Sequence, residues 1–117
     1  SLRRLITDLN SIRREQPALQ RFRGLRFHET SNDRILCYSK SLDDGSRPVL
    51  CVVNLDPVWR QSALLDFSPG QLSPQLAGPY QVEDLLTGRS YRWEQGFNYV
   101  ELDPRQLPAH IFAVTAA

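Results

Sequence analysis

The sequence predicts a mainly β domain: an antiparallel Greek-key β-sandwich of about eight strands, preceded by one amphipathic helix. From residue 25 onward, short runs rich in β-branched and aromatic residues alternate with clusters of Gly, Pro, Asn and Asp. Before that point, apolar residues recur at intervals of three and four, which is the period of a helix with one buried face. The chain has 117 residues, which leaves room for one such domain.

The first segment is predicted to be a helix that ends at Pro17. Its apolar residues form one stripe: Leu2, Leu5, Ile6, Leu9 and Ile12. Proline lacks the N–H that a continuing helix needs, and it disfavours helical geometry at the residue before it. We therefore divide the chain into a helix, residues 1–17, and a sandwich, residues 18–117. A helix of this length is marginal alone in water, so its stripe needs a surface to pack on.

Eight segments after this boundary are predicted to be strands. They are Leu25–Glu29, Ile35–Lys40, Val49–Asn54, Ala63–Phe67, Tyr80–Leu86, Ser90–Trp93, Phe97–Leu102 and Ala109–Val114. Residues 49–53 are apolar at every position, which predicts a central strand buried on both faces. The stretch Leu65–Gly78 contains two prolines and two glycines, so we expect a long connection between sheets there.

The two cysteines, Cys37 and Cys51, are predicted to be reduced neighbours. If residues 35–40 and 49–54 form a hairpin in which Lys40 pairs near Pro48, the cysteines lie opposite each other on one face. A register shifted by one residue would put them on opposite faces instead. Two cysteines in a chain without a secretion signal favour a reducing compartment, where the thiols stay free.

Composition and motifs predict no catalytic, cofactor-binding or metal-binding residue. The formal net charge is +1, which gives no electrostatic reason to expect nucleic acid or a membrane as a partner. His28 and His110 accompany neither a nucleophile motif nor a cluster of metal ligands. The neighbouring acids Glu83 and Asp84 would point to opposite faces of a strand, so we do not expect them to act as the acid pair of a glycosidase.

Three aromatic residues are the candidates for a binding site that stacks on sugar rings. Trp59 follows a turn at Asp56-Pro57, and Tyr91 and Trp93 share one face of a predicted strand because they are two positions apart. Exposed rings at these positions would be free to bind sugar, whereas buried rings would belong to the core or to an interface between domains. The solvent exposure of the three side chains separates these alternatives.

A series of segments that covers most of the chain carries a family resemblance. The segments are Leu9–Leu19, Leu25–His28, Asn32–Lys40, Val52–Pro57, Asp84–Gly88 with Tyr91 and Trp93, Asn98–Val100 and Pro108–Phe112. Taken in this order, they resemble the C-terminal part of the α-1,4-glucan:maltose-1-phosphate maltosyltransferases of the α-amylase superfamily. No single segment is specific, and the resemblance rests on the whole series.

The resemblance implies a bacterial, cytoplasmic enzyme of glycogen biosynthesis that transfers maltosyl units from maltose 1-phosphate to α-1,4-glucan without a cofactor. Residues 1–17 would be the last helix of an upstream (β/α)8 barrel that holds the catalytic carboxylates, and residues 18–117 would be the C-terminal domain. The implied partners are that barrel, α-glucan and a second copy of the parent enzyme. In one interpretation the domain packs on the barrel and stabilises it. In the other it is a carbohydrate-binding module that contacts α-glucan through exposed aromatic side chains.

Overall fold

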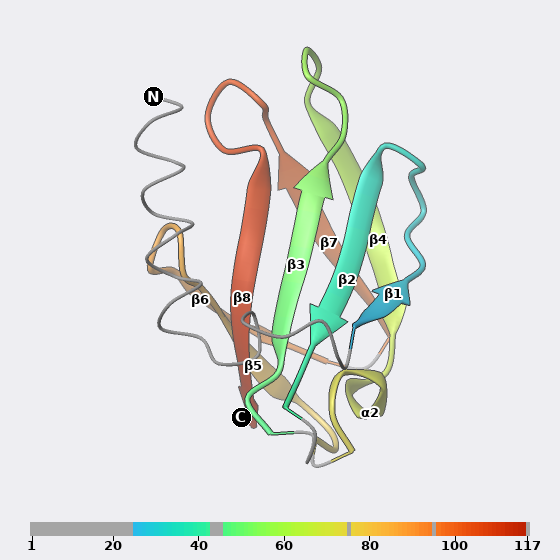
Figure 1. Cartoon of the computed structure of the whole chain (residues 1–117), viewed down its shortest axis with the longest axis vertical. Helices are drawn as coiled ribbons and strands as arrows, with labels where there is room; N and C mark the ends of the chain where they lie inside the picture. Colours follow the sequence, from blue (N-terminus) through green and yellow to red (C-terminus); the bar gives the residue numbers. More distant parts are fainter. Residues whose placement is uncertain (1–24, 43–45, 75, 95, 117) are drawn as a thin grey trace.

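The computed structural model describes residues 25–42, 46–74, 76–94 and 96–116, and these ranges are mainly β (Figure 1). Their elements are β1 (Arg26–His28), β2 (Ile35–Lys40), β3 (Val49–Asn54), β4 (Gln61–Phe67), α2 (Pro69–Leu72), β5 (Tyr80–Asp84), β6 (Ser90–Trp93), β7 (Gly96–Leu102) and β8 (Ala109–Ala116). The predicted fold class is confirmed. The predicted helix over residues 1–17 lies outside the described residues.

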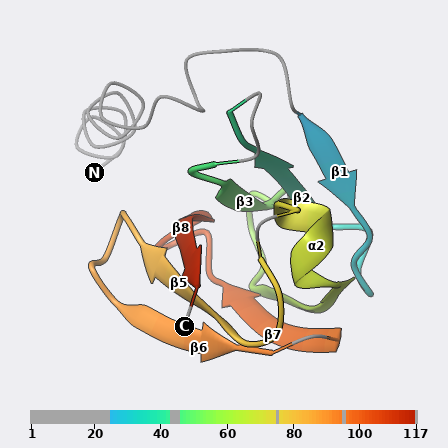
Figure 2. The ribbon, with the colours of Figure 1, turned by 90° about the horizontal axis from the view of Figure 1, so that it is seen from below.

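Two antiparallel sheets make up the fold. The larger sheet has the strand order β1-β2-β3-β8-β5-β6, and the smaller sheet consists of β4 and β7. The chain enters the smaller sheet at β4 and again at β7 and returns to the larger sheet each time. β8 then inserts between β3 and β5, as in a Greek key. Seen end on, the larger sheet curves around the smaller one (Figure 2).

The core lies between the two sheets. Alternate residues of β2, β4 and β5 are buried, as expected for strands that turn one face toward a core. The largest fully buried side chains include Tyr80, Phe112, Leu50 and Leu65. Strand β3 is buried at nearly every position because it lies between β2 and β8 in the middle of the larger sheet. This confirms the prediction for residues 49–53.

The sandwich is closed along one side and open along the other. Thr30, which follows β1, forms an isolated bridge with Leu65 of β4, and the Ser31 N–H donates to the Leu64 carbonyl at 3.1 Å. On the opposite side β6 pairs with β5 and β7 pairs with β4, and no ladder in the described ranges joins β6 to β7. The inner face of the larger sheet is therefore left uncovered near β6.

The outer face of the larger sheet carries a second apolar cluster. It consists of the buried residues Val49, Cys51 and Ile111 and the partly buried residues Tyr38, Leu85 and Leu86. The strand residues among them point away from the core because neighbours along a strand alternate between faces. A sheet face that met only water would carry mainly polar side chains at such positions.

The predicted pairing of the two cysteines is wrong by one residue. Lys40 pairs with Val49, and Pro48 stays just outside the ladder. The physical reason is that proline has no N–H to donate to a neighbouring strand. Cys37 therefore packs between the sheets while Cys51 lies on the outer face, so the two thiols cannot bond to each other in this fold. Burial raises the pKa of the Cys37 thiol to about 12.

Element boundaries differ from the prediction at β1, β4, β5, β7 and β8 and in one connection. β4 begins at Gln61, two residues before the predicted start, and it alternates between inward and outward side chains from there. The strand predicted over residues 80–86 ends at Asp84, because the Gly88 N–H donates to the Asp84 carbonyl at 2.7 Å and turns the chain toward β6. The connection predicted over Leu65–Gly78 begins after β4 and contains the single turn of helix α2.

Replacing Tyr80 by phenylalanine is expected to raise the free energy of unfolding by about 1 kcal/mol, because the change removes a buried unpaired hydroxyl. The Tyr80 hydroxyl is fully buried and has no hydrogen-bond partner among the described residues. Burial raises its pKa to about 12. Urea unfolding of the chain and the variant checks this, with Tyr99→Phe at an exposed site as the control. A Tyr80→Phe variant less stable than the unmodified chain would contradict it.

Candidate functional site

The open side of the sandwich forms a cleft of about 530 Å³ between β6 and β7. One wall comes from the larger sheet: Asp84, Thr87, Arg89, Tyr91 and His110. The other comes from β7 and its neighbours: Arg60, Tyr99, Glu101, Asp103, Gln106 and Leu107. Between the walls lie the buried residues Trp93, Val100, Leu102 and Phe112. The cleft has the size of a small-ligand site, for which about 300–1,000 Å³ is usual.

A hydrogen bond between Asp84 and His110 fixes the deep end of the first wall. Asp84 is almost fully buried, and its carboxylate accepts hydrogen bonds from the Leu86 N–H at 3.0 Å and from His110 Nδ1 at 2.8 Å. Because Nδ1 donates to the carboxylate, His110 Nε2 is left on the side of the ring away from Asp84. The imidazole is stacked on Phe112, with ring centroids 5.1 Å apart. His110 is thus held from two directions where it borders the cleft.

Aromatic rings gather around Phe112 beneath the same wall. The Trp93 ring meets Phe112 at a centroid distance of 5.1 Å and Tyr80 at 6.3 Å, both edge to face. Tyr91 also meets Phe112 edge to face, at 6.5 Å. Trp93 is only 9% exposed and belongs to the core, whereas Tyr91 is 41% exposed. Tyr91 therefore presents to the cleft a ring that is supported from behind.

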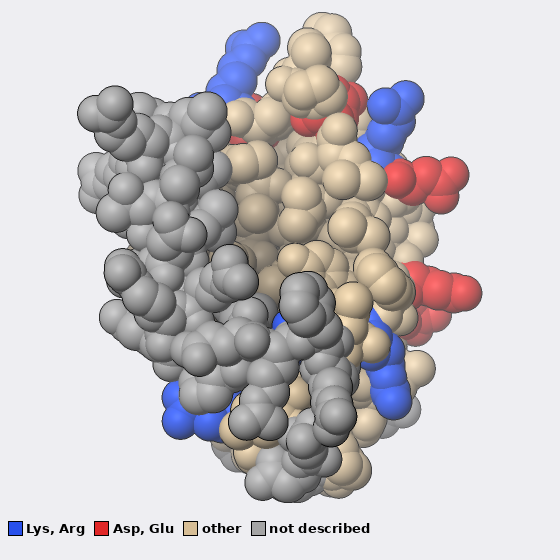
Figure 3. All heavy atoms as spheres, viewed as in Figure 1, with Lys and Arg blue, Asp and Glu red and all other residues tan. Residues whose placement is uncertain are grey.

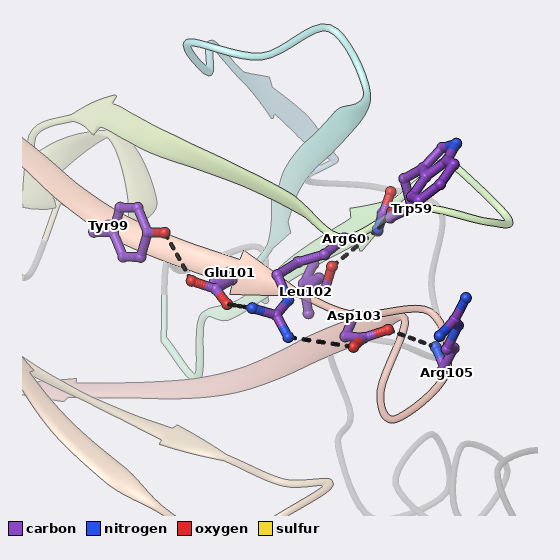
Figure 4. A network of polar contacts seen from close by, with 8 residues as sticks. Trp59, Arg60, Tyr99, Glu101, Leu102, Asp103 and Arg105 are labelled. Atoms are coloured by element: carbon purple, nitrogen blue, oxygen red, sulfur yellow. Dashed lines mark hydrogen bonds and ion pairs between the residues drawn. The ribbon is translucent and has the colours of Figure 1, made fainter.

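A network of polar contacts lies on the outer face of the smaller sheet, along the edge of β7 that borders the cleft (Figure 4). The Tyr99 hydroxyl donates to Glu101 Oε2 at 2.8 Å, and Arg60 Nη1 lies 3.1 Å from Glu101 Oε1. Arg60 Nη2 lies 3.6 Å from Asp103 Oδ2, so one guanidinium joins both carboxylates. Exposed pairs of this kind stabilise a fold by less than about 1 kcal/mol. They nevertheless restrict the orientation of the Tyr99 ring, which is 58% exposed.

The third aromatic candidate, Trp59, lies outside the cleft, in the connection between β3 and β4. Its ring is 67% exposed. Asp56 Oδ1 accepts hydrogen bonds from the N–H groups of Val58 and Trp59, and Oδ2 accepts one from Gln61 Nε2 at 2.9 Å. The backbone hydrogen bonds, first that of Trp59, hold the pKa of the Asp56 carboxyl below its usual value. The fold therefore brings Tyr91 and Trp93 together but leaves Trp59 apart.

Sequence reasoning missed Tyr99 and its polar neighbours. Along β7, the exposed residues Tyr99 and Glu101 alternate with the buried residues Val100 and Leu102. This period of two is the pattern of a strand with one face in solvent, and it is visible in the sequence. What the pattern does not reveal is that Tyr91, from a different sheet, borders the same cleft.

The polar side chains at the cleft are engaged in contacts with one another. Glu101 and Asp103 share Arg60, and Asp84 pairs with His110. Within the described ranges, no three His, Cys, Asp or Glu side chains gather in a way that could hold a metal ion. No helix in this part of the chain is long and apolar enough to span a membrane. The cleft is thus bordered by aromatic rings and by polar side chains that are already engaged with one another.

The other histidine, His28, lies away from the cleft at the edge of the larger sheet. Its Nε2 is 2.7 Å from the Ser39 hydroxyl, and its ring centroid is 4.8 Å from that of Phe67. Ser39 is buried at the core face, so this contact is structural and does not offer a nucleophile to a substrate. Burial, and to a lesser degree the charge of Arg26, lowers the pKa of His28 to about 4.

The chain is expected to lose stability between pH 6.5 and about 4 through His28. In the unfolded chain this imidazole takes up its proton near its ordinary value of 6.5, whereas the folded chain takes it up near 4. The contribution is therefore fully present above pH 6.5 and is lost as the pH falls. His28→Gln, which keeps a donor for Ser39, should reduce the loss between pH 7 and pH 4.5 by about 1 kcal/mol after allowance for solvent screening. Urea unfolding of the unmodified chain and of His28→Gln at both pH values measures this difference. Equal losses of unfolding free energy in the two proteins would refute the prediction.

Solved structures place the fold in a class of β-domains found in α-amylases. The chain is similar to part of an α-amylase from Anoxybacillus, with a TM-score of 0.60 and 19% identity over 96% of this chain and 22% of that chain. It is also similar to part of AmyB, a maltogenic α-amylase from Thermotoga neapolitana, with a TM-score of 0.59 and 16% identity. That match covers 92% of this chain and 24% of AmyB. At such identities the similarity shows the fold alone.

The family described as "GLGE, C-terminal" matches residues 27–114, and the chain belongs to it. The chain is 49% identical to α-1,4-glucan:maltose-1-phosphate maltosyltransferase 2 of Streptomyces coelicolor. The aligned 110 residues cover 94% of this chain and 16% of that protein. It is 41% identical over 114 residues to the maltosyltransferase of Corynebacterium glutamicum, and this alignment covers 97% of this chain and 17% of that protein. The chain thus spans about a sixth of the length of these curated relatives. The resemblance predicted from the sequence is confirmed.

Proposed function

We propose that the chain is the non-catalytic C-terminal domain of a maltosyltransferase that elongates α-1,4-glucan from maltose 1-phosphate, and that it packs on the catalytic domain and stabilises it. The names of the relatives support the reaction. The chain matches only about a sixth of their length, which leaves room for a separate catalytic domain. A glucan-elongating enzyme of bacterial glycogen biosynthesis would work in the cytoplasm, and its homodimeric state stays a prediction from the resemblance.

The observation that carries the docking role is the apolar outer face of the larger sheet. Val49, Cys51 and Val53 follow one another on this face of β3, and Ile111 and Ala113 lie beside them on β8. Among the described residues visible in Figure 3, the charged side chains lie mainly around the margin of this face. Val49, Cys51 and Ile111 are already buried within the chain. Docking would bury the partly exposed residues beside them, such as Val53 and Ala113, at about 25 cal/mol per Å² of apolar area. A domain of the parent enzyme is the partner that these residues fit.

The geometry also supports a domain without catalysis of its own. Retaining transfer at a glycosidic bond needs two carboxylates about 5 Å apart that face each other across the sugar. Glu101, on the outer face of the smaller sheet, and Asp103 instead share Arg60 at the edge of β7. Asp84, on the other side, is buried and paired with His110. These carboxylates are therefore not arranged as the acid and the nucleophile of a retaining enzyme.

The proposed function is tested in a chimera in which this chain replaces the matching 110 residues of Streptomyces coelicolor maltosyltransferase 2. The chimera is expected to transfer maltosyl units from maltose 1-phosphate at a rate close to that of the unmodified enzyme. The 117-residue chain alone is expected to transfer none. Turnover by the purified chain, or a chimera that folds but has lost activity, would contradict the proposal.

A second candidate function is that of a carbohydrate-binding module in contact with α-glucan. The observation that favours it is the exposure of Tyr91 and Trp59, two of the three aromatic residues singled out in the sequence. The two functions are compatible, because the outer face and the open cleft belong to different surfaces of the larger sheet.

A further inference from the structure

We infer that the outer face of the smaller sheet is a binding surface for neutral α-glucan, on which a sugar ring stacks against Tyr99. The inference rests on the second candidate function and deepens it, because it gives the contact with glucan a place and a set of residues. That place is neither the cleft nor the loop that carries Trp59.

The pairing of β4 with β7 gathers this surface from alternate positions of the two strands. Leu64 pairs with Tyr99, and Ser62 pairs with Glu101. All four residues are exposed, as is Asp66 further along β4, whereas the residues between them in each strand are buried in the core. Because side chains alternate between the faces of a sheet, the exposed residues lie side by side on its outer face.

Tyr99 and Leu64 provide the apolar part of the surface. They lie directly opposite each other, and they are 58% and 42% exposed. Side chains that pair in this way are in reach of each other, so the ring and the leucine form one apolar strip across the sheet. The C–H groups on the face of a pyranose ring pack favourably on an aromatic face, which carries negative charge density.

The Tyr99 ring is oriented before a ligand arrives. Its hydroxyl donates to Glu101 Oε2 at 2.8 Å, and in Figure 4 it points along β7 toward that carboxylate. Arg60 in turn holds Glu101, with Nη1 3.1 Å from Oε1. A ring that is already oriented loses less conformational entropy when a sugar stacks on it.

The polar groups beside the ring keep capacity for hydroxyl groups. The side chains of Arg60 and Glu101 are 61% and 42% exposed. The contacts with Tyr99 and Arg60 use only about two of the four lone-pair positions of the Glu101 carboxylate, and a guanidinium carries more N–H donors than Arg60 uses here. Sugar hydroxyls donate and accept at once, so an exposed carboxylate beside an exposed guanidinium is a complement to them.

These polar groups favour Tyr99 over Trp59, although the Trp59 ring is more exposed. The polar side chains next to Trp59 are occupied in holding its loop: Asp56 accepts from the Trp59 N–H at 3.0 Å, and Asn54 donates to the Trp59 carbonyl at 3.1 Å. The exposed side chains of Leu55 and Val58 beside it are apolar. Hydrogen bonds to hydroxyls fix the orientation of a sugar, so the surface around Tyr99 is the better site.

The charges of the surface favour neutral glucan over a sugar phosphate. The carboxylates of Asp66, Glu101 and Asp103 lie on or beside it, and Arg60 is already engaged by the last two. Phosphate sites present unopposed Arg, Lys or backbone N–H groups to the ligand. A phosphate at Tyr99 would meet carboxylates at short range, so maltose 1-phosphate is not the ligand of this surface.

The test is a titration of the ¹⁵N-labelled 117-residue chain with maltoheptaose, followed by amide chemical shifts. We expect saturable shifts along β4 and β7 with a Kd of about 1 mM. Tyr99→Ala should weaken binding by about tenfold, whereas Tyr99→Phe, which keeps the ring, should retain most of the affinity. Trp59→Ala is the matched control, because it removes an exposed ring away from this surface, and it should leave the affinity unchanged. The ¹⁵N spectra of the free variants show whether each has kept its fold.

The outcomes separate this inference from the function on which it rests. Shifts that centre on Trp59 or Tyr91, with an affinity that Tyr99→Ala leaves unchanged, would overturn the surface and leave glucan binding by the domain intact. An equal loss in Tyr99→Phe and Tyr99→Ala would contradict stacking on the ring. No saturable shift at about ten times the expected Kd would overturn both the surface and the second candidate function. Maltose 1-phosphate binding along β4 and β7 more tightly than maltose would contradict the assignment to neutral glucan.

Discussion

Replacing Asp84 by alanine is expected to lower the free energy of unfolding of the chain by about 3 kcal/mol or more. The side chain is 1% exposed, and its two oxygens accept hydrogen bonds from Leu86 and His110. Alanine leaves the Leu86 N–H and the imidazole without their acceptor in a region that water barely reaches. The main-chain carbonyl of residue 84, which accepts from the N–H groups of Thr87 and Gly88 in the turn from β5 to β6, is kept in the variant, so the loss reports the side chain.

Urea unfolding followed by circular dichroism measures this loss. Asp66→Ala, at an exposed position on the outer face of β4, is the matched control and should change stability by no more than about 0.5 kcal/mol. Asp84→Asn keeps one acceptor oxygen and should fall between alanine and the unmodified chain. A loss below about 1 kcal/mol for Asp84→Ala would show that the pair with His110 does not organise this end of the cleft.

Phe112→Ala is expected to lower the free energy of unfolding by about 3–5 kcal/mol, the range found when a large buried aromatic residue is truncated. Phe112 is 1% exposed, and its ring meets those of Tyr91, Trp93 and His110. The variant should therefore also change the environment of Trp93. Its tryptophan fluorescence should move toward longer wavelength as water gains access to the indole.

The control for Phe112→Ala is Phe27→Ala, which removes the same side chain at a position that is 65% exposed on the edge strand β1. Phe27→Ala should lower the free energy of unfolding by only about 0.5–1 kcal/mol, because it removes one ring contact with Tyr38. Thermal and urea unfolding of the two variants should therefore differ widely. Equal losses would mean that Phe112 does not anchor the aromatic wall.

Most of the fold could be predicted from local sequence patterns. Short runs of strand-forming residues between turn signals marked the strands, and a continuous apolar run marked β3 as the central strand. The register of the β2–β3 hairpin could not be predicted reliably, because it depends on whether Pro48 joins the ladder. One residue of difference was enough to put Cys51 on the opposite face of the sheet from Cys37.

The candidate site was harder to predict because it is built by contacts between distant segments. Tyr91 was identified from the sequence, but its role depends on Phe112, which follows 21 residues later in the chain. Trp93 looks like Tyr91 in the sequence, yet the packing of Tyr80 and Phe112 around its ring buries it. The cleft exists because the smaller sheet has two strands and cannot cover all of the larger sheet. No local pattern contains that information.

Docking of the outer face of the larger sheet is tested most directly by placing a lysine on each side of the sandwich in the chimera. Val53→Lys puts a charge on the outer face of β3, at a position that is partly exposed in the chain alone. Leu64→Lys puts the same charge on the outer face of the smaller sheet, where the leucine is exposed. Each variant is made both in the chimera and in the 117-residue chain, and the midpoint of thermal unfolding is measured for all.

Docking predicts that Val53→Lys lowers the midpoint of the chimera by several degrees more than that of the chain alone, because a docked lysine would lose its water. Leu64→Lys should shift both midpoints little and equally. If Val53→Lys lowers the midpoints of the chimera and the isolated chain by the same amount, the outer face is not buried against the catalytic domain, and the proposed stabilising role is contradicted.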